Sequence, residues 1–329
     1  MRATSGTASA KVLFRMAEAA GCFIAYAMLF PFVRRPSLPY PTAKQFQANE
    51  DAGRIWTFWA DDNPPELVKA CLANLRESNP HHEIILLNRH TVADWIDPYM
   101  FDKQAMWPIQ IAADAIRIEL LARYGGVWID ATAIVNADVR SLLPVSQRRN
   151  VTFRGFCRGS AEADLPIPEL WFLSARAKDP FFMEWAEEMR GLFSFQRAEE
   201  WIAFMKARHG KSFQIICEGI SKTKEEGYFA SAIAARSIWL RSRDKPTFCL
   251  VSSDDYVFKY HDLAKWWPPV TAAYLCARGF PSDLPPVVKV TRSERNLLSA
   301  IMITGLYRAE SLVGRSIFKH RKDAALSRS

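Results

Sequence analysis

The sequence predicts an α/β fold of the Rossmann type, and three observations lead to this prediction. From residue 54 on, segments of strand-like composition alternate with segments of helical periodicity, and the connections between them are short. Such an alternation is how a parallel sheet is built. Of 329 residues, 49% are hydrophobic and 24% are charged, values typical of globular proteins. The longest apolar run has 15 residues, which excludes a protein with several membrane-spanning helices.

The first βαβ unit is predicted at the start of this alternation. Residues 54–59 form a β-rich run, and the pattern Asn-Pro-Pro-Glu from Asn63 is typical of a capped helix start. That helix is expected to end at Asn79, which precedes a proline. The apolar run 83–87 has the length of a buried strand, and another helix is expected to open at Thr91. These elements predict two neighbouring parallel strands.

The next segment is a predicted helix that leads into a short strand. Apolar residues at helical spacing between positions 109 and 120 predict a core-facing stripe. The helix is expected to end at Gly125 and Gly126, because glycine readily takes the left-handed conformation that closes a helix. Residues 127–129 then form a strand, and Asp130 follows its carboxyl end. Since ligands of parallel α/β sheets bind beyond the carboxyl ends of the strands, this topology places Asp130 at the mouth of a site.

The second half of the chain carries weaker signals. Its elements are predicted as strands at 151–154, 171–175, 248–252, 256–260 and 287–291, and as helices at 179–193 and 198–208.

The N-terminal residues predict a helix of limited apolar length. The 15 apolar residues from 19 to 33 reach only ~22 Å as a helix, short of the roughly 30 Å hydrocarbon core of a bilayer. Arg34 and Arg35 follow this run in place of a small-residue cleavage site, which argues against a cleaved signal peptide. We expect shallow insertion into a membrane surface, with a short signal-anchor or a helix packed on the protein itself as the alternatives. Residues 36–41 are expected to form an extended linker.

The net charge of +8 is concentrated at the two ends of the chain. Residues 1–40 carry +4 and residues 287–329 carry +6, which leaves −2 for the middle. A nucleic-acid enzyme would place its positive field on the folded domain, so no nucleic-acid partner is expected. The C-terminal segment 294–322 mixes apolar and basic residues in a pattern suited to an anionic membrane surface. The six cysteines lie far apart, which favours a reducing compartment over a disulfide framework.

The block from Ala113 to Thr132 carries a resemblance to a known family. An Asp-X-X-Arg helix runs into Tyr-Gly-Gly and then into Trp-Ile-Asp-Ala-Thr. This block resembles the capsular polysaccharide synthesis protein family, glycosyltransferases with a DXD-like sugar-donor motif. The resemblance extends to the first βαβ unit and, more loosely, to residues 171–182 and to Val-Val-Lys-Val-Thr at 287–291.

The resemblance implies a fold and an activity. The fold is a GT-A-like, Rossmann-type domain with a mixed central sheet at residues 50–292, flanked by helical extensions at 1–49 and 293–329. The implied activity is transfer of a sugar, with retention, from a nucleotide-sugar donor (a UDP-sugar) to a polysaccharide or lipid-linked glycan. The expected place is cytoplasmic, at the inner face of the cell membrane.

The resemblance also implies roles for individual residues. Catalytic roles fall to Asp130, Asp114 and Arg117, donor binding to Trp56, Trp59, Gly125, Gly126, Asp130, Thr132 and Lys289, and binding of Mn²⁺ or Mg²⁺ to Asp130 and Thr132. One departure concerns the metal: Thr132 stands where a full DXD has its second carboxylate, and a neutral hydroxyl is a poorer ligand for a hard cation. Two consequences stay open: either Thr132 coordinates the cation weakly with help from water and the diphosphate, or metal dependence is reduced and Lys289 carries more of the charge on the diphosphate.

Each of these residues also has a structural interpretation. Asp114 and Arg117 have the spacing of an ion pair on a helix surface, and Asp130 has that of a plain strand-end cap. Core packing explains Trp56 and Trp59 as readily as stacking on a nucleobase, and Lys289 is compatible with a solvated strand. Two other classes of protein stay open: a catalytically decayed carbohydrate-binding protein on the same fold, and a basic protein that docks on nucleic acid or membrane.

Overall fold

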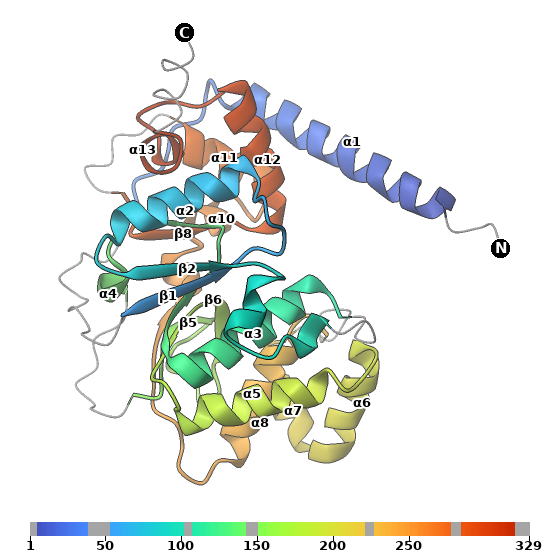
Figure 1. The fold of residues 1–329 in the computed structure, drawn as a ribbon. Helices are drawn as coiled ribbons and strands as arrows, with labels where there is room; N and C mark the ends of the chain where they lie inside the picture. Colours follow the sequence, from blue (N-terminus) through green and yellow to red (C-terminus); the bar gives the residue numbers. More distant parts are fainter. Residues whose placement is uncertain are drawn as a thin grey trace.

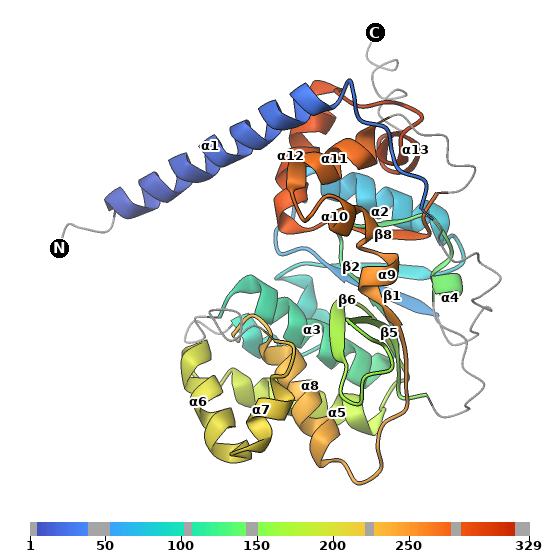
Figure 2. The same cartoon turned by 180° about the vertical axis from the view of Figure 1, so that it is seen from behind.

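The computed structural model describes residues 5–38, 53–101, 107–142, 151–220, 227–277 and 284–319, with side chains from Met16 on. Figure 1 shows a central sheet with helices on both of its faces. The same chain is seen from behind in Figure 2. The predicted α/β fold is therefore confirmed.

The central sheet is mixed, as expected. Its strands are, in spatial order, β2 (Glu83–Leu87), β1 (Arg54–Phe58), β3 (Gly126–Ile129), β6 (Ile167–Ala175), β5 (Phe153–Arg158) and β7 (Phe248–Ser252). β1 pairs in parallel with both β2 and β3, which confirms the predicted βαβ unit. β6 is antiparallel to β3 and β5, whereas β7 runs parallel to β5. A second, two-stranded antiparallel sheet joins β4 (Ala133–Val135) to β8 (Val287–Lys289).

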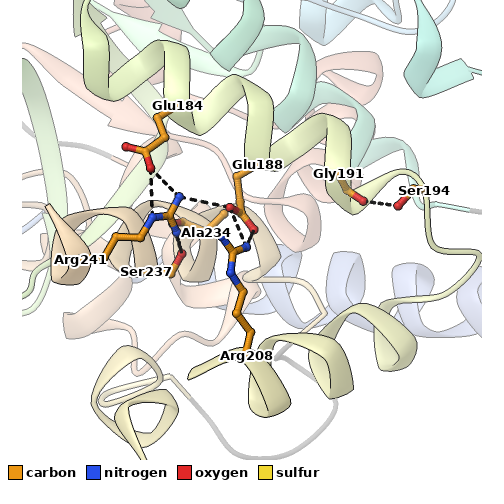
Figure 3. Close-up of polar contacts among 8 residues, drawn as sticks. All are labelled: Glu184, Glu188, Gly191, Ser194, Arg208, Ala234, Ser237 and Arg241. Atoms are coloured by element: carbon orange, nitrogen blue, oxygen red, sulfur yellow. Dashed lines mark hydrogen bonds and ion pairs between the residues drawn. The ribbon is translucent and has the colours of Figure 1, made fainter. Parts of the chain in front are cut away.

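One face of the sheet is covered by five helices. They are α3 (Ile109–Tyr124), α5 (Pro180–Leu192), α6 (Ala198–His209), α7 (Ser212–Ile216) and α8 (Ala230–Arg241). Ion pairs join three of these helices at their exposed sides (Figure 3). Arg241 on α8 contacts Glu184 of α5 at 2.6 Å, and Arg208 on α6 contacts Glu188 of α5 at 2.8 Å.

Further helices lie beyond the opposite face or beside the sheet. They are α2 (Glu66–Ser78), α4 (Val139–Leu142), α9 (Ser253–Tyr256), α10 (Lys259–Leu263), α11 (Pro268–Cys276), α12 (Arg292–Thr304) and α13 (Leu312–Ser316). Short 3₁₀ turns stand at Thr91–Asp94, where a helix was expected to open, and at Tyr99–Phe101. The predicted strand at 256–260 is wrong, because these residues belong to α9, α10 and the turn between them. The predicted cap at Asn63 is also wrong: α2 begins at Glu66, and Pro65 precedes it.

The C-terminal segment is part of the protein core. The apolar residues that suggested a membrane-facing surface are buried among α1, α11, α12 and α13, and they include Leu297, Leu298, Ile301, Leu312, Val313 and Ile317. The expectation that this segment lies on a membrane is therefore corrected. Its amphipathic pattern has an ordinary cause, since the apolar face of a helix is also what packs on a protein core. The predicted boundary after residue 292 falls at the start of α12, which packs against α2 and α11.

The N-terminal helix α1 (Ser5–Leu29) points away from the body in both views (Figures 1 and 2). Tyr26 and Phe30, at its C-terminal end and just beyond it, are buried in the same cluster as α11 and α12. Met16, Ile24 and Met28 are exposed. Within the part of the chain that the structure describes, no helix combines the length and the apolar character needed to cross a bilayer.

Candidate functional site

A cavity of about 520 Å³ opens beyond the carboxyl ends of β1 and β3. This is the edge at which parallel α/β sheets bind ligands. Its walls come from the ends of β1, β3 and β5 and from the start of β6. The first half of α3, the start of α8 and the segment that leads from β8 into α12 complete them. The volume lies within the usual range for small-molecule sites.

Asp130 stands directly after β3 and faces this cavity. Its backbone N–H donates to the carbonyl of Trp171 on β6 at 2.9 Å, which continues the pairing of β3 with β6 beyond the last residue of β3. Oδ1 accepts hydrogen bonds from the Trp128 indole N–H at 3.0 Å and from Arg117 at 3.2 Å. Oδ2 accepts one from the Lys289 ammonium at 2.6 Å. The side chain is 25% exposed, so it is anchored by these hydrogen bonds and is still accessible from the cavity.

These contacts keep Asp130 ionised. Burial alone would raise its pKa, but the charges of Lys289 and Arg117 and the hydrogen bonds from Lys289 and Trp128 outweigh burial and hold the pKa at about 2. Asp130 therefore carries its negative charge at every pH at which the protein is expected to work.

Lys289 reaches Asp130 because two distant parts of the chain pair in the small sheet. β8 lies antiparallel to β4, with Lys289 opposite Ala133. Thr132 extends this pairing: its hydroxyl donates to the Val290 carbonyl at 3.2 Å, and its own carbonyl accepts from the Val290 N–H at 3.3 Å. The Thr132 hydroxyl also accepts a hydrogen bond from Lys289 at 3.2 Å.

Asp114 and Arg117 lie on the cavity side of α3. They form an ion pair at 3.3 Å, which their spacing on the helix had suggested. The pair is buried, however, and does not lie on the helix surface, and Arg117 also contacts Asp130. The Arg117 guanidinium also lies over the Trp128 ring, 4.9 Å from its centroid. Burial raises the pKa of Asp114 to about 7 in spite of the neighbouring Arg117.

A further acidic side chain, Glu169 at the start of β6, lines the same cavity. Burial raises its pKa to about 7, with Arg158 opposing this effect and Asp254 adding to it. Carboxylates with raised pKa values in a cleft are characteristic of functional sites.

Trp59 lines the cavity, and its role in donor binding stays a prediction. It follows β1, and the Arg295 guanidinium of α12 lies 5.2 Å from its ring centroid. A flat aromatic face beside a guanidinium suits a nucleobase or a sugar ring.

Three predicted donor-binding residues lie away from the cavity. Trp56 is fully buried in β1 and donates its indole N–H to the Gly125 carbonyl at 2.9 Å. Gly125 and Gly126 pack against protein backbone, where a Cβ would lie 2.4 Å from the Ala177 nitrogen and 2.5 Å from the Arg54 carbonyl oxygen. Trp56, Gly125 and Gly126 therefore do not contact a ligand in the cavity, and this expectation is corrected. The two glycines instead allow the backbone of β1 and of the chain after β6 to pack closely against them.

Sequence reasoning missed three contributors. Trp128 is two residues before Asp130, and alternate residues of a strand share a face, so its hydrogen bond to Asp130 had a detectable signal. Arg292 and Arg295, in the first turn of α12, line the cavity directly after Lys289. The Thr291–Glu294 capping box marks this helix start and was the available signal.

The arrangement of donor atoms does not fit the expected Mn²⁺ or Mg²⁺ site. Both oxygens of Asp130 already accept hydrogen bonds from cationic or N–H donors, and Thr132 offers a neutral hydroxyl. Among the described residues, no group of three or more His, Cys, Asp and Glu side chains is arranged to hold a metal ion. Mg²⁺ is usually held by one or two carboxylates together with substrate phosphates and water, and here the oxygens of the Asp130 carboxylate are already occupied by Lys289, Arg117 and Trp128.

Comparison with known proteins gives a family match and similar solved structures. The profile of the family described as "Capsular polysaccharide synthesis protein" matches residues 37–197, which confirms the resemblance found in the sequence. No curated protein matches the chain. Among solved structures, the chain is similar to "PaToxG Glycosyltransferase", with 11% sequence identity and a TM-score of 0.32, covering 78% of this chain and 95% of that one.

Proposed function

We propose that this chain is a glycosyltransferase that uses a nucleotide-sugar donor, a proposal supported by the match of residues 37–197 to the capsular polysaccharide synthesis protein family. The observation that carries the proposal is the position of Asp130 at the cavity, between the cationic groups of Arg117 and Lys289. An ionised carboxylate there is suited to binding the hydroxyls of a ribose or a sugar. The adjacent cations are suited to a diphosphate.

The proposed reaction breaks the bond between the anomeric carbon and the diphosphate. An acceptor hydroxyl oxygen forms the new bond to that carbon, the nucleoside diphosphate leaves with the bonding electron pair, and it takes up the hydroxyl proton. With retention at the anomeric carbon, as the family resemblance implies, no dedicated general base is required. Lys289 and Arg117 would stabilise the negative charge that develops on the leaving group.

The finer identities are also proposals. The donor is a UDP-sugar, and the acceptor is a growing polysaccharide or a lipid-linked glycan. The location is the inner face of the cell membrane, and α1 is the element proposed to contact that surface. Met16, Ile24 and Met28 recur at helical spacing on its exposed side, and such a stripe suits shallow insertion.

The test is hydrolysis of a panel of nucleotide sugars by the full-length protein, compared between Asp130→Asn and Asp138→Asn. Asp138 is a matched control, because its side chain is 27% exposed, contacts Arg140 at 2.6 Å and lies outside the cavity. We expect Asp130→Asn to lower donor hydrolysis by about 10²- to 10³-fold. Asp138→Asn should leave it unchanged.

Equal activity of wild type and Asp130→Asn would contradict the assignment of the site. No hydrolysis and no binding of any donor by the wild type would favour the alternative, a decayed carbohydrate-binding protein on the same fold. Thermal unfolding of each variant shows whether a loss of activity is a loss of structure.

A further inference from the structure

A positive charge already lies between the two side chains that the family resemblance assigns to a metal ion. The Lys289 ammonium is 2.6 Å from Asp130 Oδ2 and 3.2 Å from Thr132 Oγ1. A cation bound by both of these oxygens would have to occupy the same space. We propose that Lys289 replaces the divalent cation in this protein, so that its nucleotide site is metal-independent and carries a built-in cation for the diphosphate.

Thr132 supports this arrangement in a way that an aspartate does not. Its hydroxyl donates to the Val290 carbonyl and at the same time accepts from Lys289. A carboxylate has no proton to donate, so an aspartate at this position would lose the bond to Val290 and set a negative charge beside its carbonyl oxygen. A threonine in place of the second carboxylate is therefore the residue that can bind both the Val290 carbonyl and the Lys289 ammonium.

The position of the ammonium is fixed by the backbone. β8 is joined to β4 next to Thr132, and the hydrogen bonds between Thr132 and Val290 continue this pairing beyond the strand ends. Lys289 therefore projects from a paired strand, and little side-chain freedom is lost when it binds an anion. This preorganisation is what a metal ion otherwise supplies.

Two further cations extend the site toward an anionic ligand. From Lys289 the chain continues into the first turn of α12, which brings Arg292 and Arg295 to the same cavity. Together with Lys289 they offer three positive charges within seven residues of sequence. The chemical class they fit is a diphosphate ester, whose charge is spread over several oxygens.

The experiment measures metal binding and nucleotide binding separately, since only the second depends on the proposed function. The full-length protein is titrated with Mn²⁺ alone, and then with UDP in EDTA and in Mn²⁺, by calorimetry. We expect the wild type to bind Mn²⁺ no better than Asp130→Asn does, and to bind UDP with an affinity that differs by no more than about twofold between EDTA and Mn²⁺. Lys289→Met should lower UDP affinity by about 10- to 100-fold.

A two-residue exchange sharpens the test. Thr132→Asp alone should gain no Mn²⁺ site, because the new carboxylate faces the Lys289 ammonium. Thr132→Asp combined with Lys289→Met leaves two carboxylates and no ammonium, and this variant should bind Mn²⁺ and require it for UDP by about tenfold or more. Lys289→Arg retains the charge and should bind UDP without metal.

Mn²⁺ binding by the wild type that is lost in Asp130→Asn would overturn the proposal, as would UDP binding that EDTA abolishes. If the double variant does not fold, the wild type and Lys289→Arg still decide between these outcomes. If the Mn²⁺ results are as expected and UDP does not bind under any condition, the replacement of the cation is supported and the UDP donor is refuted.

Discussion

The two ends of strand β3 have different surroundings. At its first residue, Gly126, the backbone packs directly against the backbone of β1, whereas just beyond its last residue, Ile129, the Asp130 carboxylate faces the cavity. Gly126 lies where a Cβ would meet the Arg54 carbonyl oxygen at 2.5 Å, and Trp56 donates to the Gly125 carbonyl beside it. Asp130 lies four residues further on, about 13 Å along an extended strand. The glycine end and the carboxylate end of β3 are continuous in sequence, yet only the carboxylate end can meet a ligand.

This difference shows how one continuous motif serves two purposes. The glycine end sets the spacing of β1, β3 and the chain after β6, and so determines where the carboxylate end is presented. We expect a substitution at either end to lower the proposed activity. The two failures differ, because one is a loss of fold and the other a loss of chemistry.

The largest expected effect is a loss of folding stability at the glycine end. Gly126→Ala would force an alanine to a φ of 96° and against the Arg54 carbonyl oxygen. We expect the free energy of unfolding to fall by about 3–5 kcal/mol in urea denaturation. The control is Gly159→Ala, whose φ is 71° but whose Cβ meets no atom within 4 Å, so that only backbone strain of about 1 kcal/mol is expected. Equal losses in the two variants would refute the close approach of β1 and β3.

A matched pair of tryptophans compares the two ends directly. Trp56→Phe removes the hydrogen bond to Gly125 and should lower the free energy of unfolding by about 2 kcal/mol, with unchanged affinity for UDP. Trp59→Phe should leave the free energy of unfolding within about 1 kcal/mol of wild type and lower UDP affinity about 3- to 10-fold, since Trp59 lies at the cavity under Arg295. Both quantities are measured on the same samples, and a reversed pattern would contradict the division of the motif.

The smallest expected effect concerns pH and belongs to the carboxylate end. Glu169 has a pKa of about 7 in the folded protein against an ordinary value of 4.5. Its protonated form therefore stabilises the fold fully below about pH 4.5, and this contribution is lost as the pH rises through about 7. We expect the free energy of unfolding to be lower at about pH 8 than at about pH 5, and Glu169→Gln to reduce this difference by about 1–2 kcal/mol.

Asp114, whose pKa is also about 7, should retain part of the same pH dependence. The exposed Glu66→Gln variant is the control and should behave as the wild type. If Glu169→Gln leaves the pH dependence unchanged, burial does not raise the pKa of Glu169 in the folded protein.

Local patterns were enough to predict β1, α2, β2, α3 and β3. Strand and helix lengths, the glycines after Tyr124 and the position of Asp130 follow from spacing and from the topology of parallel sheets. The antiparallel place of β6 and the helices at 253–263 could not be predicted this way, because strand pairing across the sheet depends on contacts between distant residues. For the same reason the sequence does not distinguish C-terminal helices that pack on the core from helices on a membrane surface: an amphipathic pattern indicates that one face is buried, but not what buries it.

The candidate site was predicted in part. Asp114, Arg117, Asp130 and Thr132 come from one block, and their proximity follows from a helix and a strand joined by a tight turn. Lys289 was assigned to the diphosphate by resemblance, but nothing local showed that its ammonium lies on Asp130. That contact depends on the pairing of β4 with β8.

The separation of Asp130 and Lys289 by 159 positions has a consequence for biosynthesis. During translation Asp130 leaves the ribosome long before Lys289, so until residue 289 has emerged the carboxylate has the Arg117 guanidinium beside it but not the Lys289 ammonium. Closure of β8 onto β4 is therefore expected to be a late event in folding. A chain released early would hold most of the sheet but no assembled pocket.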